Sequence, residues 1–303
     1  MPAPVTVVVP THDRPELMAR AVASVLAQTY EGELEVIVVF DACDPVLPTL
    51  DVGPGRSLRG LPNSRTRGLA GGRNTGILAA QHEFVAFLDD DDEWLPTKLE
   101  RQMAEFAEHP EAALVGTAMV VDDGVRTHER RVGSTLVGHS DLIADRLPGL
   151  HSSSFVFRRS ALLDTIGLVD EDLPASYGED YDLLLRTAST SQIRVVDEPL
   201  VSVRWAGQSY FFGRWALYAQ ALQYLLSKHP GFADNRAALG RIEAQIAFAL
   251  AAVGEAKEAR RWGWRALRHA PRQIKAALAI AISFRLISTE RVLRIVRRFG
   301  KGI

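Results

Sequence analysis

The sequence has little of several features that whole classes of protein require. Its 303 residues include one cysteine, Cys43, which excludes an intrachain disulfide and a cysteine-rich zinc site. No uncharged run approaches the ~18 residues that a membrane-spanning helix needs. The N-terminus does not carry the basic segment followed by an apolar one that is typical of a secretory leader. We therefore expect a cytoplasmic protein.

The chain as a whole is nearly neutral, but its charge is unevenly distributed. A net charge of −2 argues against a general nucleic-acid binder. Residues 260–303 nevertheless carry twelve lysines and arginines against Glu290 alone, which gives this segment a net charge of +11 and leaves −13 for the first 259 residues. The two parts are expected to meet different partners.

Strand and helix patterns alternate over the first 200 residues, which is typical of an α/β protein with a largely parallel sheet. Buried strands are predicted at residues 5–9, 34–40, 84–88, 113–121 and 155–157, and short strands near a sheet edge at 195–196 and 200–204. A loop rich in proline and glycine covers 44–57, and a short helix is expected at 160–166. From residue 212 onward the patterns predict helices at 217–228, 236–252, 256–268, 274–287 and 289–299.

Four consecutive aspartates, residues 89–92, follow directly on the apolar run 84–88. The apolar run predicts a buried strand, and Pro96 suits the first turn of a following helix. The carboxylates are therefore expected at the C-terminal end of a central strand, where open α/β sheets bind ligands. Four negative charges in one loop are costly without a cation. A divalent ion, whose coordination is completed by substrate phosphates, is therefore favoured over a solvated acidic turn.

Five segments occur in an order and at spacings similar to those of a known family. They are VVVPTHDRP at 7–15, EVIVVFD at 35–41, GGRNTG at 71–76, FLDDDDEW at 87–94 and GEDYD at 178–182. Together they make the chain resemble the family 2 glycosyltransferases over about residues 4–210. The resemblance implies a GT-A fold, in which a Rossmann-like, mixed, mostly parallel sheet is flanked by helices.

The same resemblance implies a domain organisation and a reaction. A glycosyltransferase domain is expected over residues 1–211, with a donor half at 1–121 and an acceptor half at 122–211, and residues 212–303 form an all-helical C-terminal extension. Residues 122–152 are expected to provide a substrate lid and acceptor loop. The implied enzyme transfers a hexosyl or related sugar, with inversion, from a nucleoside-diphosphate-sugar to an acceptor hydroxyl.

The resemblance places the nucleotide of the donor at the ends of the first two strands. Pro10, Thr11 and His12 end the first strand, and His12 stands where the family often has a tyrosine that stacks on the nucleobase. Asp41 is expected to accept a hydrogen bond from the base imide, which fits UDP- and dTDP-sugars equally. A turn histidine at the surface and a carboxylate that only caps a turn are the simpler alternatives.

The diphosphate and the metal are assigned to charged residues. By the resemblance, Arg73 lies near the diphosphate and Arg14 adds a second guanidinium, whose planar set of N–H donors matches phosphate oxygens. The family's Asp-X-Asp motif matches the acidic loop. It implies that Asp91 ligates Mn²⁺ or Mg²⁺, whereas Asp89 or Asp90 contacts the ribose or the sugar.

The acceptor side is assigned by the Glu-Asp pair at the start of a predicted helix. The resemblance implies that Asp180 is the general base and that Glu179 binds the acceptor; a plain helix N-cap is the alternative for Asp180. His151 and Trp205 are expected to line the acceptor pocket. Ala206 stands where some members have a histidine that ligates the metal, so water would complete the shell here or the metal would bind weakly.

The sequence allows more than one role for the basic C-terminal segment and more than one kind of acceptor. Arginines and apolar residues interleave over 285–299, which is typical of an amphipathic helix on an anionic membrane surface. Packing on its own domain and a homodimer contact are the alternatives.

The acceptor is expected to be a glycan or a lipid-linked molecule. A non-catalytic GT-A-like binding or scaffold protein and a sugar nucleotidyltransferase are the competing functions; residues 9–14 lack the Gly-rich basic loop that the nucleotidyltransferase requires.

Overall fold

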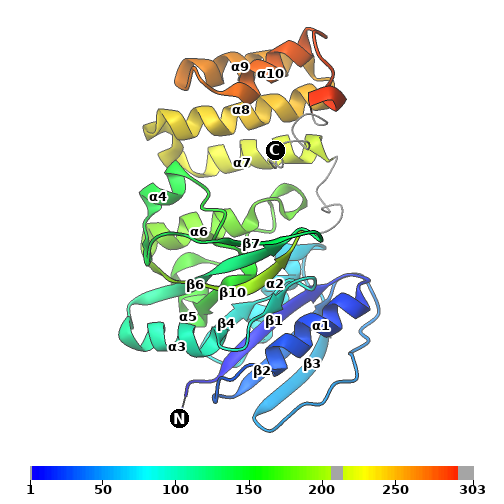
Figure 1. Cartoon of the computed structure of the whole chain (residues 1–303), viewed down its shortest axis with the longest axis vertical. Coiled ribbons are helices and arrows are strands. Elements are labelled where there is room, and N and C mark those ends of the chain that lie inside the picture. The colour runs from blue at the N-terminus through cyan, green and yellow to red at the C-terminus, as the bar shows by residue number, and fades with distance from the viewer. Residues whose placement is uncertain (1, 206–213, 293–303) are drawn as a thin grey trace. The chain divides into compact units, whose positions relative to one another are not determined.

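The computed structural model describes residues 2–205 and 214–292 (Figure 1). The chain divides into two compact units. The first comprises Met1–Leu142, Arg146–Glu171 and Glu179–Gly207, and the second comprises Ile143–Asp145, Asp172–Gly178 and Gln208–Ile303. The predicted boundary between residues 211 and 212 falls outside the described residues, so it stays a prediction, as does the division into donor and acceptor halves.

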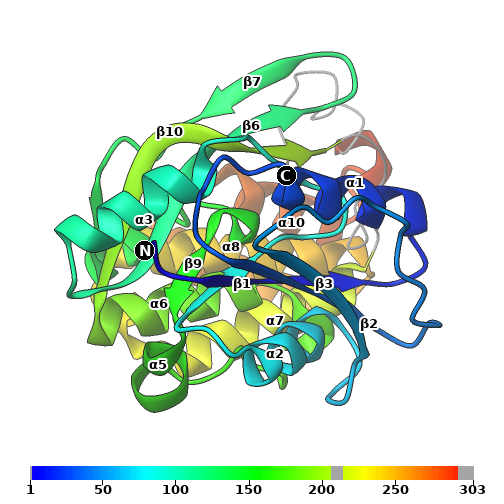
Figure 2. The same cartoon turned by 90° about the horizontal axis from the view of Figure 1, so that it is seen from below.

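The first unit is built on one sheet. Its strands within the described residues are β1 (Val5–Thr11), β2 (Leu34–Phe40), β3 (Arg56–Pro62), β4 (Phe84–Phe87), β5 (Glu93–Trp94), β6 (Ala112–Asp122), β7 (Thr127–Arg130), β8 (Leu136–Val137), β9 (Val156–Arg158) and β10 (Gln192–Arg204). They lie in the order β3-β2-β1-β4-β9-β6-β10-β5, with β7 beside β6 and β8 beside β10. Figure 2 shows β7 beside β6.

The pairing of the strands makes the sheet mixed but mostly parallel. β1 pairs in parallel with β2 and β4, β2 with β3, and β6 with β10, whereas β9 is antiparallel to both β4 and β6. The strands β1 and β2 are buried along their whole length, because helices cover both faces. The predicted fold class, an α/β sheet of GT-A type with a helical C-terminal region, is confirmed.

Six helices of the first 190 residues have these bounds: α1 (Pro15–Leu26), α2 (Leu69–Ala79), α3 (Lys98–Glu108), α4 (His139–Ala144), α5 (Arg159–Ala161) and α6 (Glu179–Thr190). Helix α1 buries its apolar stripe in the cluster that holds Val7 and Val9. Helix α2 lies on the opposite face, where a Cβ added at Gly76 would come within 2.2 Å of Val8 Cγ1. Gly72, nearer the start of α2, lies in the same way against Pro10 near the end of β1.

Three local predictions differ from the structure. Strand β3 was missed and its start was taken as loop, because its polar and half-exposed residues lack a buried apolar run and it lies at the edge of the sheet. The two strands predicted around Pro199 are one strand, β10, which keeps its pairing with β6 through register shifts at that proline. The helix predicted at 160–166 is α5 followed by a π turn, Leu162–Ile166.

The second unit is helical. It contains α7 (Trp215–Lys228), α8 (Arg236–Ala252), α9 (Ala256–His269) and α10 (Ile274–Ser283), and α8 packs between α7 and the pair α9–α10 (Figure 1). These four predicted helices are confirmed, although α10 ends at Ser283 rather than at 287. Residues 289–292 are helical, and the rest of the last predicted helix lies outside the described residues. No helix among the described residues is long and apolar enough to span a membrane.

Candidate active site

The acidic loop begins where β4 ends, beside the end of β1. The Leu88 N–H donates to Val8 O at 3.1 Å, so the central sheet continues to the first aspartate. This is the carboxyl edge of parallel strands, as the sequence predicts. The four aspartates then divide into two pairs with different surroundings.

Asp90 and Asp91 face the start of α1. Thr11 Oγ1 donates to Asp90 Oδ2 at 2.7 Å, and Arg14 Nη1 lies 3.2 Å from Asp90 Oδ1 and 3.0 Å from Asp91 Oδ2. Burial raises the pKa of both carboxyls, and Arg14 opposes the rise. Thr11 and Arg14 thus lie together with the aspartates that the sequence assigned to the donor and the metal.

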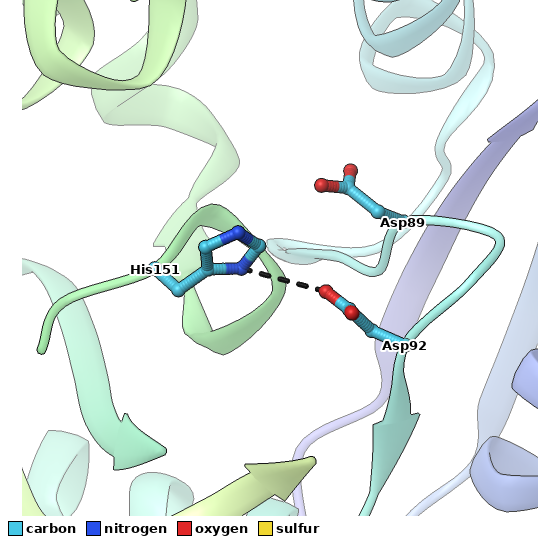
Figure 3. A group of neighbouring side chains, drawn as sticks. All are labelled: Asp89, Asp92 and His151. Atoms are coloured by element: carbon cyan, nitrogen blue, oxygen red, sulfur yellow. Dashed lines mark ion pairs between the residues drawn. The ribbon is translucent and has the colours of Figure 1, made fainter. Parts of the chain in front are cut away.

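Asp89 and Asp92 face the 3₁₀ turn Ser152–Ser154 instead. Ser152 Oγ donates to Asp89 Oδ2 at 3.2 Å, and Ser153 Oγ accepts from the Asp89 N–H at 3.1 Å while it donates to Asp92 Oδ2 at 2.6 Å. His151 precedes the turn, and its Nδ1 lies 3.5 Å from Asp92 Oδ2 (Figure 3). Two hydroxyls therefore fix the geometry of the acidic loop from a segment some 60 residues away.

These three side chains form a candidate metal centre. One ligand atom each from Asp89, Asp92 and His151 lies within 4.8 Å of the others (Figure 3). Asp92 is 2% exposed, and burial, with Asp89 and Asp91 nearby, raises its pKa well above the ordinary value. Carboxylate oxygens with an imidazole suit Mn²⁺, and a divalent cation would offset this unbalanced charge.

The sequence analysis placed the metal differently. Asp91 was predicted as the ligand, and its assignment stays a prediction. Asp92 was given no role of its own, and His151 was placed in the acceptor pocket. Only folding brings His151 to the acidic loop, so no pattern in the sequence could have joined them.

Arg73 joins the acidic loop to the start of α6. Its guanidinium, on α2, is 1% exposed. Nη2 lies 2.6 Å from Asp89 Oδ1, and Nη1 lies 2.5 Å from Glu179 Oε1. Although burial opposes its charge, these two carboxylates raise the pKa of Arg73. Both terminal nitrogens thus contact carboxylates, and the predicted role at the diphosphate stays a prediction.

Glu179 and Asp180 begin α6, and their surroundings shift their pKa values apart. Burial, together with Asp180 and Asp89, raises the pKa of Glu179 to about 7 against the opposing effect of Arg73. Burial also acts to raise the pKa of Asp180, but Arg146, together with His151 and Arg73, lowers it below its ordinary value. Arg146 Nη2 lies 3.0 Å from each carboxylate oxygen. Adjacent carboxyls with opposite shifts are typical of acid–base sites.

The residues predicted to bind the nucleobase lie at the ends of β1 and β2. His12 Nδ1 donates to the Asp41 carbonyl at 2.6 Å, which fixes the orientation of the ring. The Asp41 carboxylate accepts from Asn63 Nδ2 at 2.7 Å and from the Gly68 N–H at 2.9 Å. Asn63 was missed because it follows the unpredicted strand β3. Pro10 lies against α2, where a Cβ added at Gly72 would be 3.1 Å from its Cβ.

Trp205 follows β10 and is 47% exposed. The Arg130 guanidinium lies over its ring, 4.1 Å from the centroid. An aromatic face at the surface can stack on a sugar, so the acceptor role stays a prediction. Ala206 lies outside the described residues.

The sequence matches the model of a known family, described as Glycosyl transferase family 2, over residues 6–165. The chain belongs to this family. It is therefore a glycosyltransferase, as the sequence segments predicted.

Curated relatives are consistent with that membership. The chain is 29% identical over 282 residues to the succinoglycan biosynthesis protein ExoO of Rhizobium meliloti, covering 79% of this chain and 76% of that one. It is 31% identical over 238 residues to the pre-mycofactocin glycosyltransferase of Mycobacterium tuberculosis, covering 75% of this chain but 48% of the relative. It is 28% identical over 120 residues to the UDP-Glc:alpha-D-GlcNAc-diphosphoundecaprenol beta-1,3-glucosyltransferase WfgD of Escherichia coli, covering 39% of this chain and 47% of that enzyme. The match thus spans about half the length of two of these relatives.

Solved structures share the fold. TarS 1-349 of S. aureus, in complex with UDP-GlcNAc, has a TM-score of 0.62 at 17% identity, covering 98% of this chain and 92% of that one. The mannosyltransferase PcManGT of Pyrobaculum calidifontis, in complex with GDP-Man and Mn2+, has a TM-score of 0.56 at 19% identity, covering 97% and 84%.

Proposed function

We propose that this glycosyltransferase transfers a sugar, with inversion, from a nucleoside-diphosphate-sugar to an acceptor hydroxyl. The observation that carries the proposal is that the acidic loop and the Glu179–Asp180 pair share one site, joined by Arg73 between Asp89 and Glu179. In-line attack on the anomeric carbon needs a leaving group on one side and a proton acceptor on the other. One acidic segment would hold the cation that stabilises the departing diphosphate of the donor, and the other would accept the proton of the acceptor hydroxyl.

We assign the proton acceptor to Asp180. Its lowered pKa is consistent with an ionised carboxylate at neutral pH, and Arg146 Nη2, which donates to both carboxylate oxygens, fixes the direction of the carboxylate. Glu179 is the second candidate, because a pKa of about 7 matches the pH at which a general base works best. The contact of Glu179 with Arg73 favours a positioning role for it over proton transfer.

A divalent metal, Mn²⁺ or Mg²⁺, fits the residues at the acidic loop. Asp89, Asp92 and His151 would hold it, with Asp91 as the ligand that the Asp-X-Asp motif implies. When bound, the ion would stabilise the charge of the departing diphosphate. Arg14 contacts Asp90 and Asp91 and holds these two carboxylates in place. Solved structures with UDP-GlcNAc and with GDP-Man and Mn2+ on the same fold support a nucleotide-sugar donor.

The acceptor is proposed to be a glycan or a lipid-linked precursor in polysaccharide biosynthesis. One relative is described as acting on a diphosphoundecaprenol-linked sugar and another as a succinoglycan biosynthesis protein. A lipid-linked acceptor would place the enzyme at the inner face of the membrane, where the basic residues of 285–303 could contact anionic lipid. Alternatively, the same basic segment would form a contact between two copies of the chain in a homodimer.

The test is release of nucleoside diphosphate from UDP-, dTDP- and GDP-sugars, with and without Mn²⁺, by the wild type and by Asp180→Asn. We expect turnover of one donor class that depends on the acceptor and that Asp180→Asn abolishes while donor binding persists. Donor binding without turnover under any condition would instead favour the non-catalytic binding protein. Formation of a nucleotide-sugar from a sugar phosphate would favour the nucleotidyltransferase.

A further inference from the structure

Helix α9 (Ala256–His269) has one buried face and one charged face. Ala259, Gly263 and Ala266 are buried, and a Cβ added at Gly263 would come within 2.8 Å of Ile280 Cγ1 on α10. This seam of small residues lets α9 pack closely in its own unit. The opposite face is therefore fixed in orientation rather than free to rotate.

The exposed positions of α9 follow the helical repeat. Lys257, Arg261, Trp264 and Arg268 are all exposed, and Trp264 is 54% exposed. At about 100° per residue they fall within an arc of about 60°. We call these four residues the α9 stripe. The ring of Trp264 thus lies among cationic side chains along the helix. None of these four side chains is buried in the packing of the second unit.

The charge around the stripe is strongly positive. Between residues 255 and 285 there are eight lysines and arginines against Glu255 and Glu258, and Glu243 of α8 pairs with Arg265 at 2.9 Å. Glu258 lies 3.5 Å from Arg261, but both side chains are well exposed, so the pair is weak. A further cation, Arg236 at the start of α8, donates to the Arg268 carbonyl at 2.9 Å. Among the described residues, Lys257 and Arg268 of the stripe form no ion pair, so the stripe keeps a net positive charge.

We propose that the α9 stripe docks the protein on an anionic lipid surface, with Trp264 at the boundary between headgroups and acyl chains. Tryptophan is enriched at that boundary because its ring is apolar and its N–H remains hydrogen-bonded. Arginine and lysine beside it meet lipid phosphates, and each cation strengthens partitioning to an anionic surface by about fivefold. The stripe is distinct from the basic segment beyond residue 288.

A second copy of the chain is a poorer occupant. In a two-fold dimer the same patch contacts itself, which would bring like charges of the two copies together. A membrane with anionic lipid supplies the opposite charge instead. The proposal does not depend on the transfer reaction, because binding to lipid is measured without donor or acceptor.

The experiment is co-sedimentation of the full chain with vesicles of phosphatidylcholine containing 0 or about 30% phosphatidylglycerol. The variant R261Q/R268Q is compared with R20Q/R126Q, which removes two exposed arginines from the other unit. We expect the wild type and the control to bind the anionic vesicles alike, and R261Q/R268Q to bind about 25-fold more weakly. Circular dichroism and the Tm confirm that each variant is folded.

A second measurement addresses the tryptophan directly. Brominated lipid should quench the fluorescence of the wild type more than that of Trp264→Phe, which keeps an apolar ring and the fold. Equal quenching of the two proteins would overturn the proposal. The proposal would also be overturned if R261Q/R268Q bound anionic vesicles as tightly as the wild type. It would be overturned as well if the wild type bound neutral and anionic vesicles equally, or bound neither. A change from dimer to monomer on Trp264→Phe, seen by analytical ultracentrifugation, would assign the stripe to a protein contact instead.

Discussion

Removal of the Arg73 guanidinium should destabilise the protein in a pH-dependent way. Arg73→Met keeps a long unbranched side chain but leaves Asp89 and Glu179 without the cation that lies 2.6 and 2.5 Å from them. Loss of one partner of a buried ion pair costs about 3–5 kcal/mol. We expect a loss of that size in the free energy of unfolding of the first unit at pH 8.

The pH dependence follows from the carboxyl groups that remain. Glu179 already has a pKa raised from 4.5 to about 7, and without Arg73 the value should rise further. A folded state that binds its proton more tightly than the unfolded state is stabilised at low pH and loses that stabilisation as the pH rises through the folded-state pKa. The destabilisation of Arg73→Met relative to the wild type should therefore shrink toward pH 5.

Urea unfolding of single and double variants at pH 5 and pH 8 provides the assay. Arg73→Met combined with Glu179→Gln should be more stable at pH 8 than the sum of the single changes predicts, with a coupling of about 1–3 kcal/mol. Arg59→Met is the matched control, since Arg59 lies 2.8 Å from Glu35 but is partly exposed, and should cost about 1 kcal/mol or less. Additive changes that do not vary with pH would show that Arg73 does not hold the two carboxylates together.

The remaining predictions concern the reaction. Asp180→Asn should lower kcat by about 10²–10⁴-fold and leave the Kd for donor nearly unchanged, and a variant with full kcat would rule out its role as base. If Glu179 accepts the proton instead, kcat should rise with pH around about 7, and this rise should disappear in Glu179→Gln; persistence of the same profile in the variant would refute the assignment. Asp91→Ala should abolish the Mn²⁺-dependent part of donor binding measured by calorimetry, and His151→Ala should weaken it; unchanged affinity in both would remove the metal from this loop. Truncation after Ser288 should reduce binding to anionic vesicles, and equal binding by the two lengths would exclude the basic C-terminal segment as a contact.

Local sequence patterns predicted well those elements that bury apolar side chains on both faces or along one stripe. The strands β1, β2 and β4 are rich in valine and other large apolar residues, and such segments have few alternatives to a covered parallel sheet. Strand β3 escaped prediction because an edge strand can be polar. Because β3 was not predicted, Asn63 at its end was also missed, although its Nδ2 donates to the Asp41 carboxylate.

The sequence by itself determined the class of fold, the family and the residues of the acidic loop, because a hydrophobic run and a contiguous motif are local properties of the chain. Only the tertiary structure decided how the charges are shared. It placed Arg73 between Asp89 and Glu179, brought His151 close to Asp92, and formed the ion pair between Arg146 and Asp180. The strengths of such contacts depend on burial and on distances between segments far apart in the chain, and neither quantity exists until the sheet has formed.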